Sequence, residues 1–411
     1  MNIRAKLEVD RQFGTVLVRL VALSLCGLVL ATASCNQDAG THTDTATSGV
    51  EVTDSGGVTT VALGRVEDLS PPRLTSTLVF STRQVGVELF RATAALFLDG
   101  GEVALANSGA GEVLLLADDG SLTKRAGRSG EGPGEFGEIT TLLKTGDGFL
   151  VYDARMGRMS EFTEAGNFVT SWSFGSESSI WDLKPLARGS DGETLAIVGD
   201  SRTFYPGGVR RDTTPLMRFP QPEANPDTLT LLPATERSYA EIPGGGATRF
   251  DVGFGLGLVA SGLGDRAIVG ETGSLDLSVY RADGRQTRRI HGSGGGGEVS
   301  DGDVSEWRSE QLAQSAGLPP EFVKIMEEIP YNETFPAFQT AILGPAEMVW
   351  IGLFAHPGDE ERAWLVIGPD GRLKGRLDLP SGAEVLAVGV ELFALVQRDE
   401  MGVEDFQVHA Y

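Results

Sequence analysis

Short runs in which apolar and polar residues alternate recur along the chain, and each run is bounded by Gly, Asp or Pro. The first four runs are 92–98, 102–107, 112–117 and 121–125. A period of two is that of a half-buried β-strand, because successive side chains point to opposite faces of a sheet. Four such runs in close succession predict one four-stranded antiparallel sheet.

Five further sets of runs follow, at 139–174, 182–232, 256–291, 337–379 and 383–409. The third set is interrupted by a Pro-, Arg- and Gly-rich insertion, Phe204–Asp212, and the sixth set has only three runs. A closed ring of sheets, which leaves no exposed edge, needs its last sheet completed by an N-terminal strand. We expect Val58–Leu63 to supply that strand. The pattern predicts an all-β fold over 58–411, a six-bladed β-propeller with four-stranded antiparallel blades.

A two-helix insert at about 298–332 separates the fourth and fifth sets. The first predicted helix is Ser305–Ala316, with Asp303 or Ser305 as its N-cap. The second is Glu321–Ile329, which has apolar residues at i, i+3, i+4 and i+7. Their apolar stripes need a partner, and two arrangements remain open. The insert either caps one end of the ring or packs as a peripheral loop on the edge of a blade.

Residues 1–34 have the three parts of a secretory signal peptide. Four basic residues precede the uncharged apolar run Leu20–Ala31, and small residues follow it. The run is short for a membrane span of about 20 residues. The segment Thr32–Cys35 resembles the bacterial lipobox, which implies a lipid on Cys35 and cleavage before it. Because Thr32 stands where that motif usually has Leu, simple secretion is the alternative.

Residues 35–57 are predicted to be a disordered tether, because Thr, Ser, Gly and Asp dominate and large apolar residues are almost absent. Both cysteines of the chain, Cys26 and Cys35, precede the predicted domain, which therefore has no disulfide. These features predict a lipid-anchored protein of the bacterial cell envelope, on the periplasmic or surface side. The lipid anchor would be its only contact with the membrane.

The charge balance narrows the class of partner. The chain carries 34 Lys and Arg against 57 Asp and Glu, a formal charge of −23. A field of that sign repels phosphate backbones, so we expect no nucleic-acid partner and no binding to an anionic membrane surface. Hydrophobic residues make up 41% of the chain, which is enough to bury a sizeable core.

Residues 149–166 resemble the repeat of NHL-type six-bladed β-propellers. An apolar run ends at Asp153, Arg158 opens the next run, and Gly166 stands in the following turn. The resemblance implies that Asp153 and Arg158 are a structural pair that bridges strands within a blade. The preceding repeat departs from this pattern, with Asn107 and Glu112 at the corresponding positions. More narrowly, the layout is similar to bacterial six-bladed propeller lipoproteins of unknown activity.

The segment Gly127–Phe136, GRSGEGPGEF, joins the first set of strands to the second. It overlaps a G-x-G-x-x-G pattern, but a strand rather than a helix follows, so nucleotide binding is disfavoured. Arginines gather around this joint, and Arg suits bidentate binding of an anion. Arg128, Glu131 and Arg155 are therefore candidate ligand-binding residues. The alternative is that these charges only form ion pairs between strands.

The sequence predicts no metal and no other cofactor. Its four histidines lack the close spacing of a zinc site, and no D-x-D-x-D-G calcium loop is present. No catalytic residue stands out, so we expect a binding protein rather than an enzyme, with a protein or small-molecule ligand on a propeller face. One alternative is a metal-dependent propeller enzyme of the gluconolactonase-like or lyase-like kind. Another is a scaffold component of the cell envelope.

Overall fold

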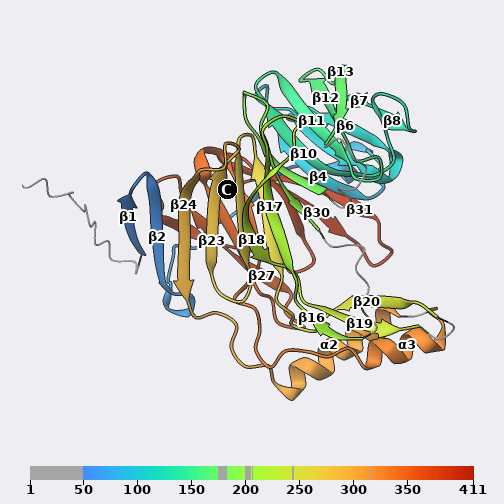
Figure 1. The fold of residues 1–411 in the computed structure, drawn as a ribbon, viewed down its shortest axis with the longest axis vertical. Helices are drawn as coiled ribbons and strands as arrows, with labels where there is room; N and C mark the ends of the chain where they lie inside the picture. Colours follow the sequence, from blue (N-terminus) through green and yellow to red (C-terminus); the bar gives the residue numbers. More distant parts are fainter. Residues whose placement is uncertain (1–49, 175–182, 200–204, 206, 243–244, 316) are drawn as a thin grey trace, which may run out of the picture. The chain divides into compact units, whose positions relative to one another are not determined.

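The computed structural model describes residues 50–174, 183–199, 205, 207–242, 245–315 and 317–411 (Figure 1). The predicted signal peptide, Cys35 and most of the predicted tether lie outside these residues. Within them, no helix combines the length and the apolar composition that crossing a membrane requires.

Six sheets form the body of the domain, and we number them in chain order. The first holds β4 (Ala92–Phe97), β5 (Val103–Asn107), β6 (Glu112–Leu116) and β7 (Leu122–Ala126). The second holds β10 (Ile139–Thr145), β11 (Gly148–Asp153), β12 (Arg158–Thr163) and β13 (Phe168–Ser173). The third holds β14 (Leu183–Arg188), β15 (Thr194–Val198), β17 (Thr213–Phe219) and β18 (Asp227–Pro233).

The other three sheets follow the same plan. The fourth contains β21 (Leu258–Leu263), β22 (Arg266–Glu271), β23 (Asp276–Arg281) and β24 (Gln286–Ser293). The fifth contains β25 (Phe338–Leu343), β26 (Val349–Leu353), β27 (Glu361–Ile367) and β28 (Leu373–Pro380). The sixth contains β29 (Glu384–Val388), β30 (Leu392–Arg398), β31 (Glu404–Ala410) and the N-terminal strand β3 (Thr77–Ser81).

The first strand of each sheet contacts the first strand of the next, and the sequence of contacts closes on itself. The contacting pairs are β4–β10, β10–β14, β14–β21, β21–β25, β25–β29 and β29–β4. This cyclic order is that of a six-bladed propeller, so the predicted fold is confirmed. The buried apolar clusters lie between neighbouring sheets, as where Val113 and Leu115 of the first meet Phe149 and Val151 of the second.

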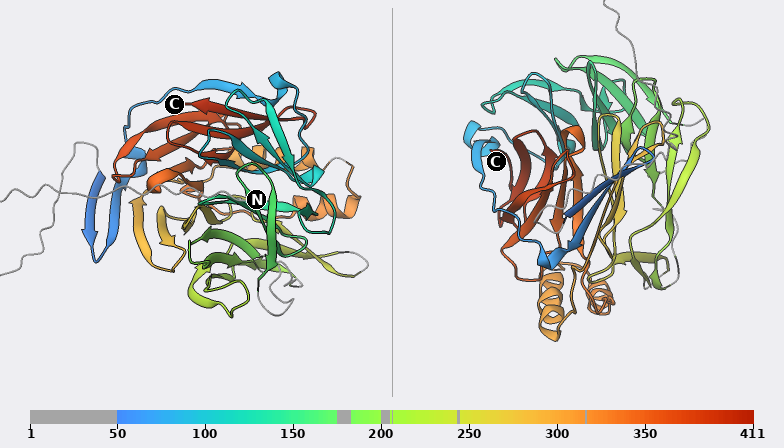
Figure 2. Two further views of the ribbon diagram at one scale, coloured as in Figure 1. Left: turned by 90° about the horizontal axis from the view of Figure 1, so that it is seen from above. Right: turned by 90° about the vertical axis from the view of Figure 1, so that its left-hand side faces the viewer.

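The ring is closed by an N-terminal strand, as expected, but the strand is β3 and not Val58–Leu63. Strand β2 (Val58–Arg65) instead pairs in parallel with β24, the outermost strand of the fourth sheet (Figure 2). The prediction was wrong because two N-terminal runs were available, and pairing depends on packing that periodicity does not reveal. Val61 and Leu63 are buried against the fourth and fifth sheets.

The tether prediction was wrong at its C-terminal end. Residues 50–55 form strand β1 (Val50–Ser55), which pairs with β2 and extends the fourth sheet to six strands. Gly56 and Gly57 turn the chain with φ of 61° and 80°, values that glycine adopts without strain. The segment was predicted as a tether because its composition is polar. Two strand signals were present in it: the alternation of Val50 and Val52, and the glycine pair that is typical of a hairpin turn.

The two ends of the ring differ. Hydrogen bonds join the like ends of neighbouring innermost strands. Where β4 and β10 begin, Thr93 Oγ1 donates to Ile139 O at 2.8 Å. Where β14 and β21 end, Arg188 N donates to Gly264 O at 2.8 Å. Neighbouring innermost strands therefore run in the same direction. We call the end where they begin the joint end, because the segments that join the sheets lie there, and the opposite end the turn end.

The larger insertions lie at the joint end. The described part of the Phe204–Asp212 insertion includes β16 (Gly208–Arg210), which forms a small sheet with β19 (Arg237–Glu241) and β20 (Ala247–Asp251). A short parallel pair, β8 (Arg128–Ser129) and β9 (Glu135–Phe136), lies within the Gly127–Phe136 joint. Strands β16, β19 and β20 were not predicted, because the short polar runs there do not alternate clearly.

The two predicted helices are present as α2 (Asp301–Gln314) and α3 (Pro320–Glu327). The N-cap of α2 is Ser300, whose capping box with Asp303 starts the helix earlier than predicted. The insert packs on the segment that leads into the fourth sheet. There Gly253 N donates to Pro330 O at 2.9 Å, and Phe254 contacts Trp307 with ring centroids 5.5 Å apart. The insert lies beside β19 and β20 (Figure 1), which matches the peripheral alternative.

Candidate functional site

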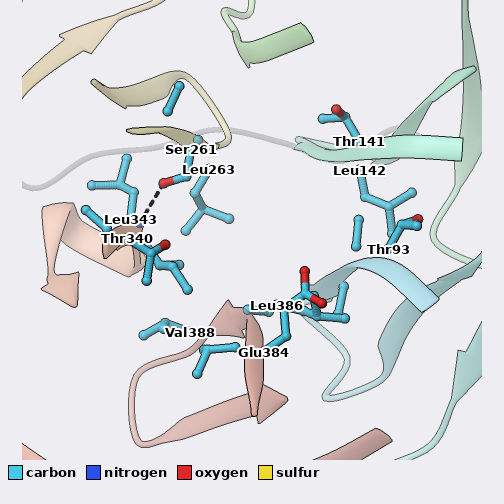
Figure 3. Close-up of a pocket in the computed structure, with 18 of the residues that line it drawn as sticks. Thr93, Thr141, Leu142, Ser261, Leu263, Thr340, Leu343, Glu384, Leu386 and Val388 are labelled. Carbon is cyan, nitrogen blue, oxygen red and sulfur yellow. Dashed lines mark hydrogen bonds between the residues drawn. The ribbon is translucent and has the colours of Figure 1, made fainter. Parts of the chain in front are cut away.

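A cavity of about 810 Å³ runs along the centre of the ring. All six innermost strands line it, and Figure 3 shows residues of β4, β10, β21, β25 and β29 around one open space. The side chains of these innermost strands determine what this space can hold. A cavity of this size can enclose a small molecule.

The lining of the cavity changes along its length. Because the innermost strands begin at the joint end, their early residues surround that mouth, and these include Thr93, Lys184 and Glu384. Their later lining residues, toward the turn end, are mostly apolar and include Leu263 and Leu343 (Figure 3), with Lys144 as the charged exception. A ligand in the cavity would therefore present polar groups to the joint end and apolar groups to the turn end.

Lys184 is a cation placed among apolar neighbours. It is the second residue of β14, between the buried residues Leu183 and Pro185, and its Nζ donates to Ala260 O at 2.9 Å. The side chain is exposed to water in the cavity, but many protein atoms surround it, and the partial desolvation that they cause lowers the pKa of Lys184. Among the described residues, no carboxylate forms an ion pair with it.

Arg362 is a second cation on the cavity wall. It lies at the start of β27, which runs parallel to β25 and so also begins at the joint end. Its Nε is buried and has no hydrogen-bond partner, and its guanidinium forms no ion pair within the described part of the chain. Burial lowers the pKa of Arg362, because no anion offsets the loss of water.

The remaining charges of the lining are already paired. Glu384 accepts from Arg398 Nη1 at 3.5 Å, and Arg398 Nη2 donates to Glu404 at 2.9 Å. Near the turn end, Lys144 is paired with Asp99. Lys184 and Arg362 are therefore the cations of the lining that the described carboxylates do not neutralise.

The predicted ligand-binding residues lie at the Gly127–Phe136 joint and do not line the central cavity. Arg128 is exposed and donates through Nε to Glu135 Oε1 at 2.8 Å. The backbone carbonyl of Glu131 accepts from Arg158 Nη1 at 3.0 Å. Arg155 is exposed beside Gly137. Ligand binding by Arg128, Glu131 and Arg155 stays a prediction.

The predicted structural pair also meets this joint. Asp153 is fully buried, and its carboxylate accepts from the backbone N–H groups of Gly137, Glu138, Arg155 and Met156 at 2.7–3.1 Å. These bonds fix the end of β11 to the segment that enters β10.

Arg158, opposite Asp153 in the β11–β12 register, donates to the carbonyls of Glu131, Gly132 and Glu135 at 2.8–3.0 Å. Asp153 accepts from the two N–H groups directly after the joint, while Arg158 donates to three carbonyls of the joint. Each residue thus holds one blade to the segment that precedes it.

Lys184 and Arg362 were not among the residues predicted from the sequence. A signal was present for Lys184, since a single cation interrupts the apolar run Leu183–Ala187 of an innermost strand. No comparable signal marked Arg362, which occupies the third strand of its sheet and reaches the cavity only through the packing of neighbouring blades.

The metal-dependent alternative requires side chains that could coordinate a metal ion. Within the described residues, no group of three or more His, Cys, Asp or Glu side chains is placed to hold a metal ion. Glu384 is the carboxylate of the cavity lining, and it is paired with Arg398. The described residues therefore do not fit a bound divalent ion.

No protein-family model and no curated protein sequence matches the chain. Solved structures with a related course of the backbone include a gluconolactonase from Xanthomonas campestris, at 10% identity and TM-score 0.42, covering 84% of this chain and 96% of that one. Regucalcin, a calcium-binding protein from Agrobacterium tumefaciens, matches at 9% identity and TM-score 0.39, covering 83% and 97%. A DUF4221 family member from Bacteroides vulgatus matches at 12% identity and TM-score 0.39, covering 81% and 98%. Likenesses this distant carry no argument about activity.

Proposed function

We propose that this protein is a binding protein of the bacterial cell envelope whose propeller takes an anionic small molecule at the joint end of its central cavity. One observation carries the proposal: Lys184 and Arg362 line the same central cavity, and the described carboxylates leave both without an ion-pair partner. The buried Nε of Arg362 has no hydrogen-bond partner, which is costly, and a bound carboxylate or other oxyanion would remove that cost.

The chemistry of the two groups favours an oxyanion. Arg presents a planar set of donors that matches a carboxylate, and Lys adds a compact positive charge. A hydrogen bond to a charged group typically contributes about 1.5–3 kcal/mol to stability. The apolar turn end of the cavity suits a less polar remainder of the same molecule. The net charge of −23 gives no long-range attraction to an anion, so selectivity depends on these local contacts.

The proposal includes export and lipid anchoring, with a lipid on Cys35 and residues 36–49 as the remaining tether. The basic, apolar and small-residue regions before Cys35 support it. The test is fractionation of cells that express the wild type or Cys35→Ala. We expect the wild type in membranes and the variant in the soluble extracytoplasmic fraction; a variant that stays with membranes contradicts the anchor.

Anion binding is tested by isothermal titration calorimetry with hexanoate, a carboxylate on an apolar chain. We expect saturable binding that weakens tenfold or more in Lys184→Met and in Arg362→Met, since tenfold corresponds to about 1.4 kcal/mol. Arg285→Met is the matched control, because it removes one exposed cation from a turn between β23 and β24. Equal affinities in all four proteins contradict the proposal.

A further inference from the structure

A second, smaller pocket adjoins the central cavity. It has a volume of about 220 Å³, and residues at the end of β15, in β16, β17, β19 and β20, and at the start of β21 line it. Leu258, the first residue of β21, lines both spaces. The pocket therefore lies beside the mouth of the cavity at the joint end, where the inserted sheet begins.

Arginines dominate the lining of this pocket. Arg210, Arg237 and Arg249 line it, with Asp212 as the acidic residue of the lining. Arg210 and Arg237 stand directly opposite each other on the antiparallel strands β16 and β19. Like charges in directly opposed positions destabilise a sheet, so this pairing needs a compensating contact.

The described contacts that offset positive charge differ between these arginines. Arg237 is paired with Asp251 across β19 and β20. The guanidinium carbon of Arg210 lies 5.3 Å from the centre of the Tyr205 ring. The acidic residue of the lining, Asp212, accepts a hydrogen bond from Tyr205 Oη at 3.1 Å. The described lining thus holds three arginines and one carboxylate; Arg237 is offset by Asp251, Arg249 also has a partner, and the described contact of Arg210 is with an aromatic ring.

We propose that this arginine pocket is a second oxyanion subsite, and that the ligand carries two oxyanion groups joined by a less polar stretch. One group would meet Lys184 and Arg362, the second would meet the arginine pocket, and the stretch between them would pass Leu258. The inference rests on the proposed function, because it assigns the class of ligand to that same site. Two linked contacts raise affinity, since the second forms within one molecule.

The test compares alkane monocarboxylates with α,ω-alkanedicarboxylates of the same chain length, titrated by calorimetry into the full chain. A series of lengths is needed, because affinity is highest when the linker matches the span between two sites. We expect the wild type to bind two monocarboxylates or one dicarboxylate. At the best length, the dicarboxylate should bind at least about a hundredfold more tightly than the monocarboxylate.

Variants separate the two subsites. Arg210→Gln should remove one monocarboxylate site and the advantage of the dicarboxylate, and Arg249→Gln should do the same if Arg210→Gln fails to fold. Arg362→Met should remove the other site. The second-subsite inference is overturned if the wild type binds one monocarboxylate, through Arg362, and no dicarboxylate binds more tightly; the proposed function then stands. If Arg362→Met and Lys184→Met change nothing while Arg210→Gln abolishes binding, the proposed function fails, and the two-group ligand fails with it.

Discussion

Ser81 Oγ donates a 2.8 Å hydrogen bond to Asp405 Oδ1, across 324 positions of the sequence. The bond joins the end of β3 to β31 within the sixth sheet and so fastens the closure of the ring. Asp405 also accepts from Thr82 Oγ1 at 3.2 Å, from Arg83 N at 3.0 Å and from Gln407 Nε2 at 2.9 Å. A single carboxylate therefore satisfies donors from both parts of the chain that meet there.

Asp405→Ala should destabilise the domain by about 2–3 kcal/mol, because it leaves buried donors without an acceptor. The measurement is chemical denaturation followed by tryptophan fluorescence. Asp118→Ala is the matched control: Asp118 is exposed in a turn, and its replacement should change stability by less than about 0.5 kcal/mol. Equal effects of the two substitutions would contradict the role of Asp405 in closure.

The same carboxylate predicts a loss of stability in acid. Burial works to raise the pKa of Asp405, but hydrogen bonds from Gln407, Arg83, Ser81 and Thr82 outweigh it and hold the pKa below the ordinary value of 3.8. At a pH near the two pKa values of Asp405, the unfolded state binds more protons than the folded state does. The free energy of unfolding therefore rises with pH. The contribution is complete above pH 3.8 and is lost as the pH falls through the lower pKa of the folded state.

Thermal unfolding of the wild type and Asp405→Asn between pH 6 and pH 3 checks this dependence. Asp405→Asn should start from a lower midpoint and lose less of it on acidification, because its side chain does not titrate. Asp118→Asn should follow the wild type. A steeper loss in Asp405→Asn than in the wild type would show that the sign is wrong.

The position of the β1–β2 hairpin can be tested at Gly371. A Cβ built there would lie 2.9 Å from Val61 Cγ2 and 3.2 Å from Val52 Cγ2, and the residue has φ of 77°. Gly402 has φ of 78° with nothing within 4 Å of its Cβ position. Each alanine pays about 1–2 kcal/mol for the left-handed backbone, and Gly371→Ala also overpacks the hairpin contact.

We expect Gly371→Ala to cost at least about 1 kcal/mol more than Gly402→Ala in denaturant unfolding. Deleting β1 and its turn, residues 50–57, should remove part of that difference, because Val52 is then gone while Val61 of β2 remains. Equal costs of the two substitutions in the full chain would mean that the hairpin does not pack on the fifth sheet.

The blades were predictable because their strands show a period of two with turn residues at each end. Ala92–Phe97 and Val103–Asn107, for example, lie within one residue of the predicted runs. Two N-terminal features were not predictable in the same way. Val50–Ser55 has a polar composition that outweighed its alternation, and the choice between β2 and β3 for closure depends on contacts such as Ser81–Asp405.

The candidate site was predictable only in part. Lys184 interrupts an apolar strand, which is a readable sign of a side chain that faces a cavity. Arg362 and Arg210 come from different sheets and from positions with ordinary polar neighbours. Arg362 lines the same cavity as Lys184, and Arg210 the same pocket as Arg237, only because of how the blades and the inserted sheet pack, and one sequence does not encode that in a local pattern.

Binding of an oxyanion by Lys184 and Arg362 can be tested in a single titration. Hexanoate is titrated into the wild type, the Lys184→Met/Arg362→Met double variant and Arg285→Met, after thermal unfolding has verified that all three fold. The account predicts that the double variant loses a binding site that the wild type and Arg285→Met retain. A double variant that binds hexanoate as the wild type does, or a wild type that binds none, would contradict it.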